Sequence, residues 1–124
     1  MKDTRPVNLD IGTIKLPITA YASITHRVSG VILVVASFIM LWALEASLAG
    51  PDSFAALADL LASPLAKFIA WGIGSALLYH SIAGIRHLVM DFGIGESMEG
   101  GVLGARIVFA LTALGAVALG VALW

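Results

Sequence analysis

The sequence contains no cysteine, few charged residues and no excess of basic ones. Without cysteine in its 124 residues, disulfides, thiolate metal sites and cysteine-ligated iron–sulfur clusters are excluded, so any cofactor must be held by histidine, carboxylates or packing. Charged residues make up only 12%, about half of what a soluble domain carries, which excludes a soluble globular domain. Seven Lys and Arg against eight Asp and Glu give a formal net charge of -1, so a nucleic-acid partner is not expected.

Long apolar runs take the place of charge, and 60% of the residues are hydrophobic. A helix needs about 20 residues to cross a hydrocarbon layer about 30 Å thick. Three stretches of that length hold few or no ionisable residues, at about 28–48, 66–90 and 104–124. We therefore expect an all-α membrane protein, a single membrane-anchor domain over residues 1–124. Three transmembrane helices follow an amino-terminal segment, 1–27, on the inner side, and a short interfacial helix fits 54–62.

The distribution of lysine and arginine predicts the orientation, because the translocated side of a membrane protein holds few of them. Only Lys67 lies on the predicted outer side. The others precede the first span or flank the second connection: Lys2, Arg5, Lys15, Arg27, Arg86 and Arg106. The amino terminus should therefore face the cytoplasm, with the protein in the inner (cytoplasmic) membrane. Trp42, Trp71 and Trp124 all fall toward the predicted outer side, where indole rings favour the interface.

One ionisable side chain, His80, lies close to the midplane of the second span. An ionisable residue at this depth predicts a functional site. Residues four apart share a helix face, so Gly72, Ala76, His80 and Gly84 form a stripe of otherwise small residues. On its own the stripe is best explained by a packed partner helix with the histidine hydrogen-bonded across it. It also fits a flat haem ring ligated by a neutral imidazole.

Arg86 and His87 follow on the same predicted helix and favour the haem explanation over the packed partner helix. His87 lies seven positions after His80, on roughly the same face, and about 10 Å nearer the inner side. Both residues are placed where haem propionates would emerge toward the lipid headgroups. For Arg86 taken alone, snorkelling to lipid phosphate is the simpler explanation.

A third polar group, containing Ser23, His26 and Arg27, opens the first span at the inner surface. Ser23 and Arg27 are four apart and share a helix face. A hydroxyl, an imidazole and a guanidinium at an apolar boundary can hydrogen-bond a quinone carbonyl and stabilise charge on its oxygen. The same residues also fit a helix start, with Ser23 as the cap and Arg27 on phosphate, and the spacing alone leaves both explanations open.

Four segments together carry a resemblance to a known family: Arg5-Pro-Val-Asn-Leu, Leu16-Pro-Ile-Thr, Ser23-x-x-His-Arg-Val-Ser-Gly and His80-x-x-x-Gly-Ile-Arg-His-Leu-x-x-Asp91. Over essentially the whole chain, they resemble the cytochrome b membrane-anchor subunit of succinate dehydrogenase, respiratory complex II. The two histidine motifs are specific only in combination. The sequence departs from the family's pattern in its short tail before Arg5 and in Thr25, which takes the place of a bulky apolar residue.

The resemblance implies that a second small three-helix anchor subunit completes the helix bundle. Together, the two anchor subunits would dock the iron–sulfur and flavoprotein subunits, and electrons would pass from succinate to ubiquinone. It implies that His80 is an axial ligand of the iron of a haem b shared with that partner. It places Ser23 and Arg27 in the quinone site, and His26 and Arg27 near the haem propionates. Asp91 matches an acidic residue of the family whose role stays open. The chain alone is not expected to oxidise succinate, because it has no flavin-binding fold and no cysteine.

Other functions fit some of the same features. A haem-free structural or assembly anchor would use the small residues only to pack helices. A fumarate reductase anchor has a related architecture, although the His80 and Ser23-x-x-His26-Arg27 matches favour the succinate-oxidising branch. A small transporter component, with His80 as a proton relay, would be expected to show an inverted repeat, and the sequence shows none.

Overall fold

The computed structural model describes residues 7, 9, 10 and 12–124, and all regular structure within them is helical. The helices are α1 (Ile18–Leu48), α2 (Pro51–Leu61), α3 (Pro64–Asp91) and α4 (Met98–Leu123). With 31, 28 and 26 residues, α1, α3 and α4 are long and apolar enough to cross a membrane. The predicted all-α membrane fold with three transmembrane helices is confirmed.

Serine caps and a glycine turn set the ends of the helices. The side chain of Ser63 accepts a hydrogen bond from the backbone N–H of Ala66 at the start of α3, and Ser97 caps α4 in the same way. Between these two helices, Gly93 and Gly95 have φ values of 81° and 74°, in the left-handed region that favours glycine. The chain can therefore reverse its direction within a short connection.

The first long helix begins well before the apolar run that marks the predicted span. It starts at Ile18, after Pro17 as the N-cap residue, whereas the run begins near residue 28. Ser23 therefore lies inside α1 and does not cap it, which makes the capping explanation of Ser23 wrong. The short helix α2 occupies the connection in which a helix over 54–62 was expected.

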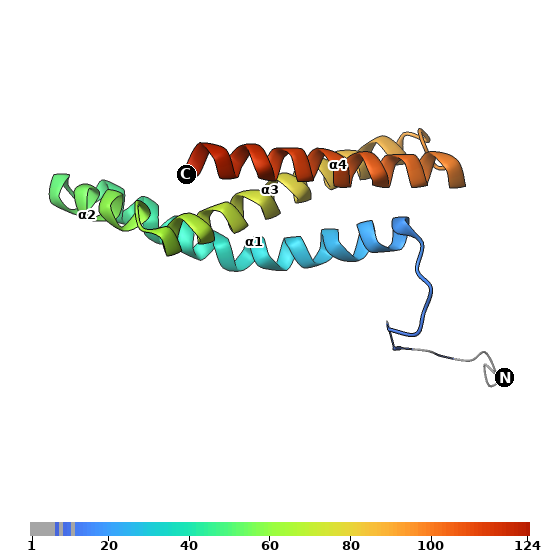
Figure 1. Cartoon of the computed structure of the whole chain (residues 1–124), viewed down its shortest axis with the longest axis horizontal. Helices are drawn as coiled ribbons and strands as arrows, with labels where there is room; N and C mark the ends of the chain where they lie inside the picture. Colours follow the sequence, from blue (N-terminus) through green and yellow to red (C-terminus); the bar gives the residue numbers. More distant parts are fainter. Residues whose placement is uncertain (1–6, 8, 11) are drawn as a thin grey trace.

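The helix α3 lies between α1 and α4 and packs against both, while α2 lies beside the carboxyl-terminal end of α1 (Figure 1). The start of α1, the end of α3 and the start of α4 consequently lie at one end of the bundle. The buried centre is small and consists of Tyr79 and Ala83 from α3 with Val108 from α4. Most large apolar side chains face outward, as expected for helices whose solvent is lipid.

Glycines allow α3 and α4 to approach each other closely. Gly74 of α3 lies against Leu119 of α4, and Gly115 of α4 lies against Leu78 of α3. A Cβ atom at either glycine would collide with the facing leucine, so each glycine makes the space that the leucine fills. This exchange of small and large side chains sets the distance between the two helices.

Candidate functional site

Three histidines lie together toward the end of the bundle where α1 starts: His26 of α1 with His80 and His87 of α3. The ring of His26 stacks on that of His80, with centroids 4.3 Å apart and an angle of 25° between the planes. The centroid of His26 also lies 5.2 Å from that of His87. We call these three residues the histidine cluster. His26 bridges the other two, a contact between helices that spacing along one helix could not reveal.

His80 is held on one edge by α1. Its Nδ1 atom lies 2.9 Å from Oγ of Ser29 and 3.3 Å from the carbonyl oxygen of His26. Ser29 is buried, and its hydroxyl donates to the same carbonyl at 2.6 Å. Within the described part of the chain, no hydrogen bond reaches Nε2 of His80. One nitrogen of this imidazole is therefore engaged by the protein and the other is available.

This arrangement fits an axial ligand of a haem iron. One imidazole from this chain would be enough to hold such a group, because the macrocycle brings nitrogen ligands of its own, and a ligating histidine characteristically uses its second nitrogen to bond the protein. Gly30 lets the ring lie close to α1, since a Cβ there would come within 3.3 Å of Cε1 of His80. A bare metal ion fits less well: over the described residues, no group of three or more His, Asp or Glu side chains could hold one.

Ser23 and Arg27 lie one turn apart on α1, before and after His26. Ser23 is half-buried and Arg27 is exposed. Neither side chain makes a hydrogen bond or ion pair with any residue that the structure describes. A hydroxyl and five guanidinium N–H donors are therefore available to a molecule bound outside this chain.

Arg86 is directed toward α4. Its Nη2 atom donates to the carbonyl oxygen of Gly101 at 3.2 Å, and a Cβ on Gly104 would lie 3.1 Å from its Nε. Part of the guanidinium is therefore bound to α4. Its buried Nε has no hydrogen-bond partner among the described residues, so the guanidinium still has a donor to offer. Its predicted place at haem propionates stays a prediction.

Sequence reasoning missed Tyr79, which joins α1 to α3 beside the histidine cluster. Its hydroxyl donates to the carbonyl oxygen of Ala22 at 2.7 Å and hydrogen-bonds with the hydroxyl of Thr25. Its ring is 8% exposed and stacks on Phe109 of α4 at 5.8 Å. Thr25, one departure from the family's pattern, thus has a partner on α3. The available signal was a tyrosine within an apolar helix, since a buried phenol needs a hydrogen-bond partner.

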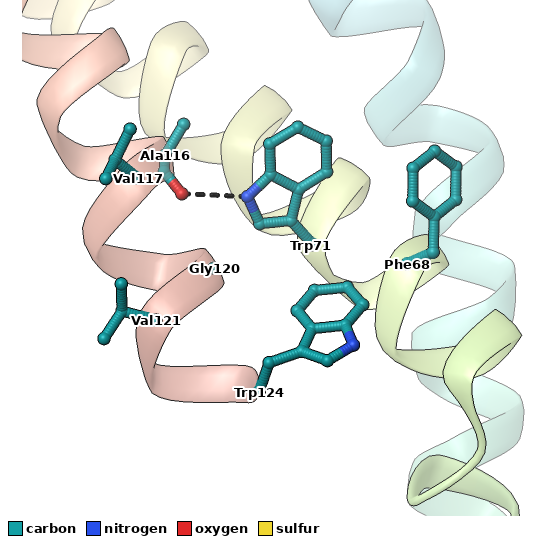
Figure 2. A pocket seen from close by; sticks show the side chains of 7 residues that line it. All are labelled: Phe68, Trp71, Ala116, Val117, Gly120, Val121 and Trp124. Carbon is teal, nitrogen blue, oxygen red and sulfur yellow. Dashed lines mark hydrogen bonds between the residues drawn. The ribbon is translucent and has the colours of Figure 1, made fainter.

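Two grooves lie toward the other end of the bundle, away from the histidine cluster. One runs between α3 and α4 (Figure 2) and is lined by Phe68, Trp71, Ala116, Val117, Gly120, Val121 and Trp124. The other lies between α1 and α2 and includes Trp42 and Leu57. Neither lining contains an ionisable side chain, and the indole N–H of Trp71 already donates to the carbonyl oxygen of Ala116 at 2.8 Å. Both linings are therefore mainly apolar.

The fold and the site define a multi-pass membrane protein in which the half-buried imidazole of His80 is hydrogen-bonded to a neighbouring helix through Nδ1. The model of one family, succinate dehydrogenase/fumarate reductase transmembrane subunit, matches residues 1–119. The chain belongs to this family, and the resemblance carried by its motifs is confirmed.

Relatives from three bacteria are similar over most or all of their length, and each is a succinate dehydrogenase cytochrome b556 subunit. The Coxiella burnetii protein is 39% identical over 125 residues, covering 100% of both chains. The Paracoccus denitrificans protein is 35% identical over 98 residues, covering 79% of this chain and 75% of the relative. The Rickettsia felis protein is 33% identical over 95 residues, covering 77% and 73%. These relatives support a membrane-anchor subunit of succinate dehydrogenase.

Proposed function

We propose that this chain binds haem b and forms part of the ubiquinone-reduction site of a succinate dehydrogenase. The observation that carries the proposal is His80, whose Nδ1 is bonded to α1 while its Nε2 is unengaged by the described residues. The names of the three relatives contain cytochrome b556. The chain acts in the inner membrane, together with a second small three-helix anchor subunit, an iron–sulfur subunit and a flavoprotein subunit.

In this proposal Nε2 of His80 would ligate the haem iron, and the second anchor subunit would supply a further ligand. Haem b bound there takes up and releases single electrons. His26, Arg27, Arg86 and His87 supply N–H donors toward the propionates, because charge-assisted hydrogen bonds favour carboxylates where cationic donors gather. The unpartnered Nε2 of His26 and Nε of Arg86 are buried donors or acceptors of the kind that such a group would satisfy.

Ser23 and Arg27 hold the quinone. The Ser23 hydroxyl and the Arg27 guanidinium donate hydrogen bonds to a quinone carbonyl oxygen, which orients the ring and stabilises negative charge developing on that oxygen. Both lie near the end of the bundle that is predicted to face the cytoplasm, so protons for the quinone enter from that side. This chain supplies orientation and hydrogen-bond donors, while succinate oxidation takes place in the other subunits.

The spectrum of the purified complex tests the haem assignment. We expect His80→Ala to abolish the sharp reduced bands of a bis-imidazole haem b and to remove haem from the complex, because the macrocycle loses one axial bond. Ser81→Ala changes an exposed neighbour on the same helix and is expected to retain the spectrum. Succinate oxidation with an artificial acceptor measures the amount of assembled complex, and the haem content of both variants is divided by it. An unchanged spectrum in His80→Ala would overturn the axial assignment and support a haem-free structural anchor.

A further inference from the structure

We propose that Ser29 is a positioning residue that fixes the tautomer and ring orientation of His80, so that Nε2 is the nitrogen presented to iron. This inference rests on the proposed function, in which His80 is an axial ligand. Ser29 touches neither the iron nor the quinone in this proposal. It acts through the imidazole, from the facing helix α1.

The hydrogen-bond directions follow from the number of protons available. A serine hydroxyl has one proton and two lone pairs. The proton of Ser29 goes to the carbonyl oxygen of His26 at 2.6 Å, so its Oγ meets the His80 Nδ1 atom, at 2.9 Å, as an acceptor. Nδ1 must then carry the hydrogen of the neutral ring. The lone pair consequently lies on Nε2, the tautomer that coordinates iron.

The surroundings of the ring fix its orientation as well. A half-turn about the Cβ–Cγ bond would replace Nδ1 by a carbon and leave the buried Ser29 oxygen facing a C–H group. Ser29 is only 5% exposed, so water cannot easily replace the lost hydrogen bond. His26 stacks on one face of the ring, and Gly30 lies against its Cε1 edge. The imidazole is thus held from α1 by one strong acceptor and by close packing.

A hydrogen bond from Nδ1 to an acceptor makes Nε2 more electron-rich, which strengthens its bond to ferric iron and lowers the midpoint potential. In Ser29→Ala only the longer contact to the His26 carbonyl, at 3.3 Å, would remain. We therefore expect the haem midpoint potential of this variant to shift to a more positive value. We also expect haem to dissociate about 10-fold faster or more, the usual range for the loss of such a supporting contact.

The experiment measures the midpoint potential, the reduced spectrum and the haem dissociation rate of the purified complex. Ser37→Ala is the matched control, because Ser37 also lies on α1 and donates to a carbonyl three residues back, at 2.6 Å, but is exposed. Ser29→Thr keeps the hydroxyl and is expected, like the control, to retain the wild-type potential. A wild-type potential and haem retention in Ser29→Ala would overturn the inference, as would an equal shift in Ser29→Thr.

A further variant covers the case in which Ser29→Ala does not assemble. Ser29→Cys nearly preserves the side-chain shape but replaces a strong acceptor by a weak one. It is expected to shift the potential in the same direction by a smaller amount, and an unchanged potential would overturn the inference. The proposed function fails separately, through retention of haem in His80→Ala. A loss of haem in His80→Ala together with wild-type behaviour of Ser29→Ala and Ser29→Cys would reject only the role of Ser29.

Discussion

His26 and Arg27 are adjacent in sequence but have opposite surroundings. Successive residues of a helix point about 100° apart, so neighbours can face a packed helix and the outside. His26 packs between His80 and His87, whereas Arg27 is exposed and bonds no residue that the structure describes. The two residues of one short motif therefore have different surroundings: the imidazole lies in the contact between α1 and α3, and the guanidinium is exposed beside it.

Replacing Arg27 by alanine tests the quinone assignment. We expect succinate-to-quinone turnover to fall by about 100-fold or more, the usual cost of losing a donor to a developing oxyanion. Succinate oxidation with an artificial acceptor should be unchanged, because it does not need the quinone. Arg106→Ala is the matched control, since Arg106 is also an exposed arginine near the same end of the bundle, on α4. An equal loss of both activities in Arg27→Ala would indicate failed assembly and remove the support for a quinone contact.

The sequence could single out His80, because an ionisable side chain in the middle of an apolar span is conspicuous wherever its neighbours lie. It could not single out Ser29 as the partner of His80. Serine is common in helices, and the bond depends on the register in which α1 packs against α3. Arg86 shows the same limit: its spacing indicates a helix face, but only the fold shows that α4 covers it at Gly101.

The contact between α1 and α3 is held by one hydroxyl as well as by the histidine cluster. Tyr79→Phe removes the bonds to the Ala22 carbonyl and to Thr25 while keeping the ring on Phe109. We expect the complex to lose about 1 kcal/mol of stability, the typical worth of a hydrogen bond between membrane helices. Thermal inactivation of the purified complex in detergent measures this as a lower midpoint temperature.

Tyr21→Phe is the control for this change. Tyr21 lies on α1, which contacts α3 near the same end of the bundle, but it is 46% exposed, and its hydroxyl makes no hydrogen bond within the described residues. The midpoint temperature of the Tyr21→Phe complex should match that of the wild type. Equal effects of the two substitutions would show that the hydroxyl of Tyr79 does not join the helices.

The packing of α3 explains why the predicted stripe of small residues is only partly an interface. Each step of four residues turns about 40° around the helix, so a long row at this spacing drifts across the surface. A Cβ on Gly84 would lie 3.8 Å from Nε2 of His26, whereas one on Gly72 would meet nothing within 4 Å. The glycines that allow α3 and α4 to pack closely, Gly74 and Gly115, lie outside the stripe. Spacing alone could not choose between these rows.

The helices also extend beyond the stretches that hydropathy marks. The apolar runs show what lies in hydrocarbon, but a helix continues through polar residues until the backbone stops it. For this reason α1 begins at Ile18 and carries the whole Ser23-x-x-His26-Arg27 motif, and α4 begins at Met98, just after the Ser97 cap. The polar motifs therefore lie on rigid helical backbone, which positions a binding site more accurately than a loop would.

Taken as a whole, the chain has a small buried centre and a broad apolar surface. Buried large side chains are few among the described residues, while long rows of Val, Leu, Ile and Phe are exposed on all three long helices. In a membrane this surface is covered by lipid or by other membrane helices. The tryptophans gather beside the two apolar grooves at the end opposite the histidine cluster. Indole rings favour the membrane–water interface, so this end is expected to lie at such an interface.

The orientation of the whole chain in the membrane can be tested because the sequence has no cysteine, so an introduced thiol is the only one in this chain. Asp59→Cys in α2 and Glu96→Cys between α3 and α4 replace exposed carboxylates in the two connections. If the lysine and arginine distribution sets the topology, a membrane-impermeant maleimide should label Asp59→Cys in sealed right-side-out vesicles and Glu96→Cys in inside-out vesicles. Labelling after detergent permeabilisation controls for the reactivity of each thiol. Labelling of Asp59→Cys only in inside-out vesicles would reverse the predicted orientation and would put Ser23 and Arg27 on the side away from the cytoplasm.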